Sequence, residues 1–91
     1  MESRKPANRL DLRVAIAGRR AIKFWWKTHE VEVEPHALLQ AKRSGALVVA
    51  GWVGGSWEFY TYADMRDLVI TERIFEPRTD VPILVPSGRR A

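Results

Sequence analysis

The sequence predicts a mainly β domain, a small and highly bent five-stranded barrel that is preceded by one short N-terminal helix. Most apolar residues follow a period of two, which is typical of strands with one buried face. Short stretches rich in turn-forming residues separate these strands. A single stretch near the N-terminus has helical spacing. A chain of 91 residues is long enough for one domain.

The expected helix covers residues 9–17. Asn8 is a suitable N-cap, Asp11 stands in the capping-box position, and Gly18 is a natural C-terminal stop. Apolar residues at i, i+4 and i+7 form one stripe, the kind of face that a helix turns to the core: Leu10, Val14 and Ala17. Two arginines share another face of this helix: Arg9 and Arg13.

The first expected hairpin pairs residues 21–27 with residues 30–34, through a turn at Thr28-His29-Glu30. In its first strand the core-facing set is Ile22, Phe24 and Trp26. Pro35 is expected to end the regular pairing or to sit on an edge, because proline has no N–H to donate.

The remaining strands are expected at residues 46–52, 57–62 and 68–75. The first of these is uniformly apolar, as in a central strand that is buried on both sides. A polar turn from Lys42 to Gly45 precedes it, Gly54-Gly55-Ser56 follows it, and residues 63–65 form a short connector. We expect the core to contain Ile22, Phe24, Val33, Leu47, Val49, Leu68 and Ile70.

The chain therefore divides into a basic leader (1–8), the barrel domain (9–78) and an extended, proline-containing C-terminal arm (79–91). One helix and five short strands close most simply as a barrel of the SH3 or Sm type. An open sheet backed by the helix is the alternative.

Composition narrows the class of protein. The chain has no cysteine, which excludes disulfides, thiolate metal sites and cysteine nucleophiles. It has no apolar run of membrane-spanning length, so we expect a cytoplasmic protein without a membrane partner. The net charge of +4 resides in residues 1–20, which favours an anionic partner such as nucleic acid; a solvated basic tail is the alternative. No nucleophile–base pair or phosphate loop is present, and the row Glu30, Glu32 and Glu34 is typical of a solvated strand face. We expect no enzyme, no cofactor and no metal.

The order of these features resembles the WYL domain. The likeness rests on spacing and residue class over residues 10–78, at Ala15-Ile16, Ile22-x-Phe24-x-Trp26, Val33-x-Pro35, Leu38, Gly45, Met65, Leu68 and Phe75-x-Pro77-Arg78. The resemblance implies an Sm-like barrel from bacterial and phage transcription regulators, which senses ligands or nucleic acid and is often dimeric. It also implies that Tyr60 and Tyr62 face inward.

The chain departs from the WYL pattern at several positions. Ala46-Leu47-Val48 stands where the family has Trp-Tyr-Leu, and Phe59, Thr61 and Asp64 stand where arginines would be expected. With one readable helix, the chain also lacks the two helices of a helix-turn-helix head.

The first functional hypothesis is a regulatory module that binds single-stranded nucleic acid or a nucleotide and modulates transcription or a defence system, alone or on a larger regulator. Trp25 shares its strand face with Lys23 and Lys27, a pattern suited to base stacking beside phosphate neutralisation. Packing of Trp25 under the helix or against a second subunit is the alternative. The predicted ligand or nucleic-acid-binding residues are Arg9, Arg13, Arg19, Arg20, Lys23, Trp25, Lys27 and His36.

The alternative function is a protein-interaction or dimerisation domain without a ligand of its own. If Tyr60 faces inward, then Trp57 and Phe59 face outward and form an apolar patch. The arm is apolar and could lie along a strand edge of a second copy. The predicted interface of a homodimer is Trp57, Phe59, Val81, Ile83 and Leu84.

Overall fold

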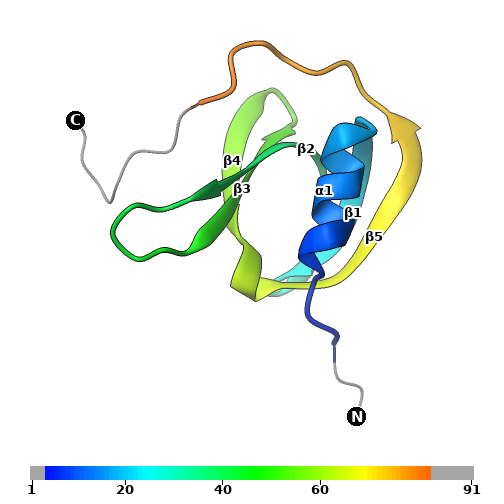
Figure 1. The fold of residues 1–91 in the computed structure, drawn as a ribbon. Helices are drawn as coiled ribbons and strands as arrows, with labels where there is room; N and C mark the ends of the chain where they lie inside the picture. Colours follow the sequence, from blue (N-terminus) through cyan, green and yellow to red (C-terminus); the bar gives the residue numbers. More distant parts are fainter. Residues whose placement is uncertain (1–3, 83–91) are drawn as a thin grey trace.

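The computed structural model describes residues 4–82. Its elements are α1 (Arg9–Ala17), β1 (Arg20–Trp26), β2 (His29–Gln40), β3 (Leu47–Val53), β4 (Ser56–Thr61), the 3₁₀ turn η1 (Tyr62–Asp64) and β5 (Met65–Ile74). The five strands form one antiparallel sheet in the order β4-β3-β2-β1-β5. The prediction of one short helix followed by five strands is confirmed. The sheet is open, with β4 and β5 as its edges, and it curves around α1 (Figure 1).

Strand β2 is longer than predicted, because it continues through Pro35. Its first half pairs with β1 as far as Val33, and its second half pairs with β3 from Glu34 onward. Pro35 belongs to the β2–β3 ladder, where it lies opposite Gly51, and a register shift interrupts this ladder between Pro35 and Ala37. The pairing of β2 with β1 ends at Val33, just before Pro35, so the prediction that Pro35 ends the regular pairing or sits on an edge is confirmed on the side of β1. On the side of β3 the pairing continues beyond Pro35, and there the prediction is wrong.

The start of β5 also differs from the prediction. The connector is η1, and β5 begins at Met65 rather than at Leu68. Residues of the N-terminal segment pair with this early part of β5: Ala7 donates its N–H to the Met65 carbonyl, and Asp67 donates its N–H to the Lys5 carbonyl. These bonds fix the position of the segment that leads into α1.

Helix α1 has the predicted ends but not the predicted buried face. The Asn8 side chain accepts a hydrogen bond from the Leu10 N–H at 2.7 Å, and the Gly18 N–H donates to the Val14 carbonyl. The residues that α1 buries are Leu12 and Ala15, whereas Leu10 is 65% and Val14 is 53% exposed. The Leu10–Val14–Ala17 stripe therefore faces solvent, because the pairing of residues 5–7 with β5 fixes how the helix enters the fold.

The core lies between α1 and the concave face of the sheet. Four predicted core residues are fully buried: Ile22, Phe24, Val33 and Val49. Leu68 and Ile70 are half-buried against this cluster, and Leu47 is half-buried outside it, so the prediction for Leu47 is wrong. Three further residues that the predicted core did not include are also fully buried: Leu12, Ala15 and Met65.

Tyr60 completes the core from β4. Its ring meets Phe24 edge-on at 5.1 Å and Trp26 edge-on at 5.0 Å between centroids. Burial, and then the charge of Glu58, raise the pKa of Tyr60. Tyr62 is half-buried against the same cluster, so the inward placement of both tyrosines is confirmed.

Within residues 4–82, no helix combines the length and the apolar character that crossing a membrane requires.

Candidate functional site

The predicted cationic residues lie on two different faces. Arg9 and Arg13 are on α1, and Arg19 and Arg20 follow at its C-terminal end. Lys23 is on β1, where Ile22 and Phe24 point toward α1, so Lys23 points to the opposite side of the sheet. The structure therefore does not bring the predicted nucleic-acid-binding residues onto one surface.

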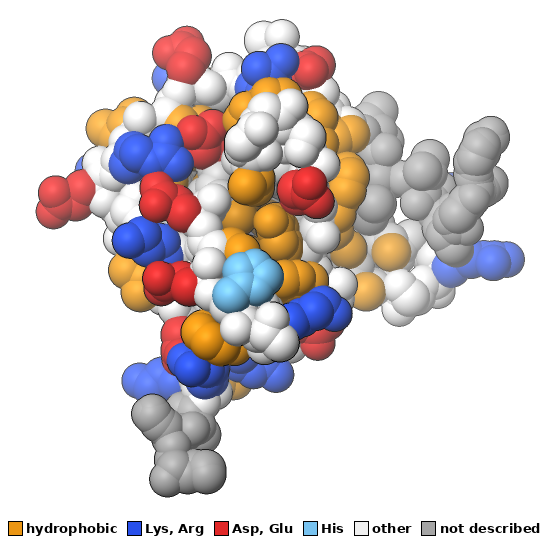
Figure 2. Space-filling model, turned by 180° about the vertical axis from the view of Figure 1, so that it is seen from behind, with side chains coloured by type: hydrophobic (Ala, Val, Ile, Leu, Met, Phe, Trp, Pro, Cys, Tyr) orange, Lys and Arg blue, Asp and Glu red, His pale blue; other side chains and the backbone are white. Residues whose placement is uncertain are grey.

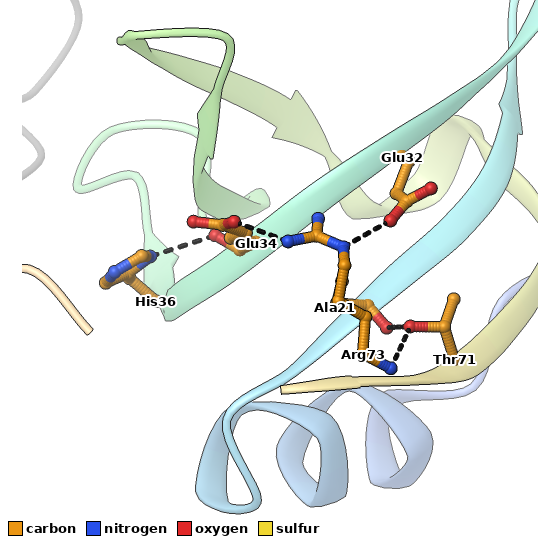
Figure 3. Close-up of polar contacts among 6 residues, drawn as sticks. All are labelled: Ala21, Glu32, Glu34, His36, Thr71 and Arg73. Carbon is orange, nitrogen blue, oxygen red and sulfur yellow. Dashed lines mark hydrogen bonds and ion pairs between the residues drawn. The ribbon is translucent and has the colours of Figure 1, made fainter. Parts of the chain in front are cut away.

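Acidic residues accompany the cations on the outer face of β1 and β2. Lys23 lies opposite Glu32 in the strand register, and Trp25 lies opposite Glu30. Arg73 of β5 reaches over this face (Figure 3), donating to Glu32 at 2.7 Å and to Glu34 at 2.8 Å. Hydrogen bonds to Glu34 and Glu32 raise the pKa of Arg73.

Figure 2 shows acidic and basic side chains interspersed on the side turned away from α1, rather than one basic area. Of the residues that the structure describes, no three His, Cys, Asp or Glu are grouped as they would be around a metal ion.

One face of the Trp25 ring is covered by Arg4 and is not free for base stacking. The Arg4 guanidinium carbon lies 3.8 Å from the centre of its ring, and the indole N–H donates to the Lys27 carbonyl at 3.0 Å. Arg4 is also paired with Asp67 at 3.0 Å. Trp25 is thus covered by the N-terminal segment of its own chain, which neither interpretation of the sequence anticipated.

His36 lies apart from the cations with which it was grouped. Its Nε2 accepts a hydrogen bond from the Arg78 backbone N–H at 3.0 Å, so its Nδ1 donates to the Glu34 carbonyl at 2.9 Å. Its ring meets Trp57 edge-on at 4.9 Å and lies 5.0 Å from Phe75. His36 therefore joins strand β2 to the segment that follows β5.

That segment crosses one end of the sheet (Figure 1) and carries Arg78 onto an aromatic surface. The Arg78 guanidinium carbon lies 3.9 Å from the centre of the Trp52 ring, and Trp52 meets Trp57 at 5.2 Å. Asp80 pairs with Arg78 at 3.0 Å, and this hydrogen bond lowers the pKa of Asp80. We name Trp52, Trp57 and His36 the tryptophan–histidine site.

The Trp57 indole N–H is buried without a hydrogen-bond partner among residues 4–82. It lies near enough to Asp80 to contribute to the lowered pKa of that carboxyl, but the two are not joined by a hydrogen bond of normal geometry.

The residues predicted to form the homodimer interface differ in their exposure to solvent. Trp57 is half-buried within the tryptophan–histidine site, while Phe59 on β4 is 44% exposed. Val81 is half-buried, and Ile83 and Leu84 lie outside the described residues.

The sequence reasoning missed the role of Trp52, Phe75, Arg78 and Asp80. A signal for Trp52 was present: a tight turn at Gly54-Gly55 places Trp52 directly opposite Trp57 in the hairpin.

The exposed face of α1 borders a shallow groove against β2. Its volume is about 290 Å³, and its lining residues are Arg13, Ile16, Ala17 and Leu38. Leu10 and Val14 do not line the groove, but they are exposed and share the helical stripe of Ala17, which does. We name Leu10, Arg13, Val14, Ala17 and Leu38 the α1 face.

Comparison of the chain with protein-family models, with curated proteins and with solved structures finds no match.

Proposed function

We propose that this protein is a non-enzymatic binding module that docks onto an acidic, amphipathic segment of a partner protein through its α1 face. The exposure of Leu10 and Val14, at 65% and 53%, carries the proposal. A surface helix normally buries its apolar stripe. This helix buries Leu12 and Ala15 instead and leaves a second apolar row in water, as interaction surfaces do.

The charge around this row selects the partner. Four arginines lie on α1 or just after it, against one acidic residue, Asp11: Arg9, Arg13, Arg19 and Arg20. A second copy of the chain would bring the same positive charge to the contact. Nucleic acid would neutralise the arginines but leave Leu10 and Val14 exposed. An acidic segment with apolar anchors matches both features.

The groove gives such a segment a place for an anchor. Ile16, Ala17 and Leu38 supply apolar walls, and Arg13 adds a cationic side chain to the lining. Helical partners bind grooves of this kind with side chains at i, i+3 or i+4, and i+7. At about 290 Å³, the groove is at the lower end of the range for small-molecule sites, which favours a side chain over a whole ligand.

We also propose that the module regulates transcription, as the first hypothesis from the sequence had it. The partner that carries the acidic segment would then be a larger transcription regulator. The WYL resemblance is supported by the inward placement of Tyr60 and Tyr62 and by the N-terminal helix before the sheet. The architecture we propose is an SH3- or Sm-type barrel that stays open between β4 and β5, supported by the register shift of β2 beside Pro35 and by the link from β4 to β5 through η1 alone.

The test is a titration of the full chain with a synthetic acidic helical peptide carrying leucines at i, i+4 and i+7, followed by backbone NMR. We expect shifts on α1 and at Leu38 that weaken with salt. Leu10→Ser with Val14→Ser should abolish them. Val69→Ser is the matched control, because Val69 is 57% exposed on β5, on another element. Arg9→Glu with Arg13→Glu should also abolish binding.

A single-stranded oligonucleotide in a parallel titration distinguishes the two partner classes. If it binds more tightly than the peptide, and Leu10→Ser with Val14→Ser leaves its binding unchanged, the surface is a nucleic-acid site. Peptide binding that survives the paired serine substitution would also contradict the proposal.

A further inference from the structure

We propose that the tryptophan–histidine site is a recognition site for an extended peptide bearing an arginine, and that residues 76–80 of the chain are its intramolecular occupant. This inference concerns a site that shares no residue with the α1 face, so the two proposals fail independently.

The occupant is held by contacts of different kinds. The Arg78 guanidinium stacks 3.9 Å from the centre of the Trp52 ring, an arrangement that uses the negative face of the indole. The backbone N–H of the same residue donates to His36 Nε2 at 3.0 Å. One residue thus presents a cation and a main-chain donor to two fixed partners. This is how an extended peptide is read: by one side chain and by its backbone.

The walls of the site are held together by contacts that do not involve the occupant. Trp52 and Trp57 are paired across the β3–β4 hairpin, and their rings meet at 5.2 Å. His36 is held from β2 by its bond to the Glu34 carbonyl and meets Trp57 at 4.9 Å. A planar guanidinium stacks on such a surface better than an ammonium does. The site therefore selects arginine over lysine.

The occupant can leave at small cost. The segment after β5 has no regular secondary structure as far as residue 82, and the Arg78 side chain is 41% exposed. Its counter-ion, Asp80, belongs to the same segment. When the segment leaves, the charged pair goes into water together and no charge is stranded in the site.

The site also has an unused donor. The Trp57 indole N–H is buried and has no hydrogen-bond partner among the described residues. Buried donors are nearly always satisfied in proteins. A carbonyl or carboxylate of a second peptide could accept this bond, which the intramolecular segment leaves unmade.

The experiment uses the full chain and a hexapeptide with the sequence of residues 76–81, Glu-Pro-Arg-Thr-Asp-Val. Binding is followed by the indole N–H resonances of Trp52 and Trp57. An occupant that fills the site in more than about nine-tenths of molecules weakens the apparent affinity at least tenfold. Arg78→Ala should therefore bind the peptide at least about tenfold more tightly than the parent. Arg43→Ala, in the β2–β3 turn, is the matched control and should leave the affinity unchanged.

Two further variants test the chemistry. Trp52→Ala in the Arg78→Ala background should abolish binding, with circular dichroism confirming the fold. A peptide with lysine in place of arginine should bind more weakly, and one with alanine should not bind. Equal binding of the arginine and alanine peptides would overturn the proposal. So would the absence of binding to Arg78→Ala at millimolar peptide, which would make the segment a structural strap.

Discussion

Gly51 of β3 and Val33 of β2 are packed so closely that a Cβ atom on Gly51 would overlap Val33 Cγ1. Both residues are buried, and Gly51 lies opposite Pro35, where β2 passes from one ladder to the other. The glycine is required for space. Its missing side chain allows the two strands to approach at the bend of the sheet.

Gly51→Ala should therefore destabilise the fold by about 1–3 kcal/mol, as overpacking of a core does. Chemical denaturation measures the change. Val33→Ala removes the atom that the new methyl group would meet, so the double variant should be more stable than the sum of the two single effects predicts. If the losses of stability of the two single variants simply add in the double variant, the contact with Val33 is not what excludes a side chain at Gly51.

Phe24→Ala should cost about 3–5 kcal/mol, which is a large part of the stability of a small domain. Phe24 is fully buried, and its ring is in edge contact with Trp26 and Tyr60. Phe59→Ala removes the same side chain from a position that is 44% exposed and should change stability by about 0.5 kcal/mol or less. Thermal or urea unfolding of both variants checks the contrast, and similar losses would contradict this description of the core.

Asp67 should make stability depend on acid pH. The Lys5 backbone N–H, and then the Arg4 guanidinium, hold the pKa of this carboxyl below its ordinary value of 3.8. The unfolded chain then takes up the proton first. The stabilisation is complete above that ordinary value and is lost as the pH falls through the lower, folded value.

Asp67→Asn tests this dependence and keeps a residue type that tolerates the positive φ of 54° at this position. The variant should melt below the parent at pH 7, and the two melting temperatures should converge toward pH 2. Asp64→Asn, in η1, is the control and should keep the melting temperature of the parent at pH 7. A constant gap between Asp67→Asn and the parent would contradict the ion pair.

The helix shows where sequence reasoning reached its limit. Asn8 and Gly18 determined the ends of α1, because capping acts within a few residues. Which face of α1 is buried does not depend on residues within the helix alone. The helix has two apolar rows, and the pairing of Ala7 with Met65 decided that Leu12 faces the core and Val14 does not.

In the sheet and in the tryptophan–histidine site, too, some features follow from the local sequence and others from tertiary contacts. Strand alternation by itself determined that Phe24 is buried and Lys23 is not, since successive side chains point to opposite faces. The contact of Arg78 with Trp52 and the hydrogen bond from Arg78 to His36, 42 residues away, were decided only by the tertiary structure. Local patterns specify which residues share a face, but they do not specify which distant segment will cross that face. That depends on the curvature of the sheet and on the path of the chain after β5.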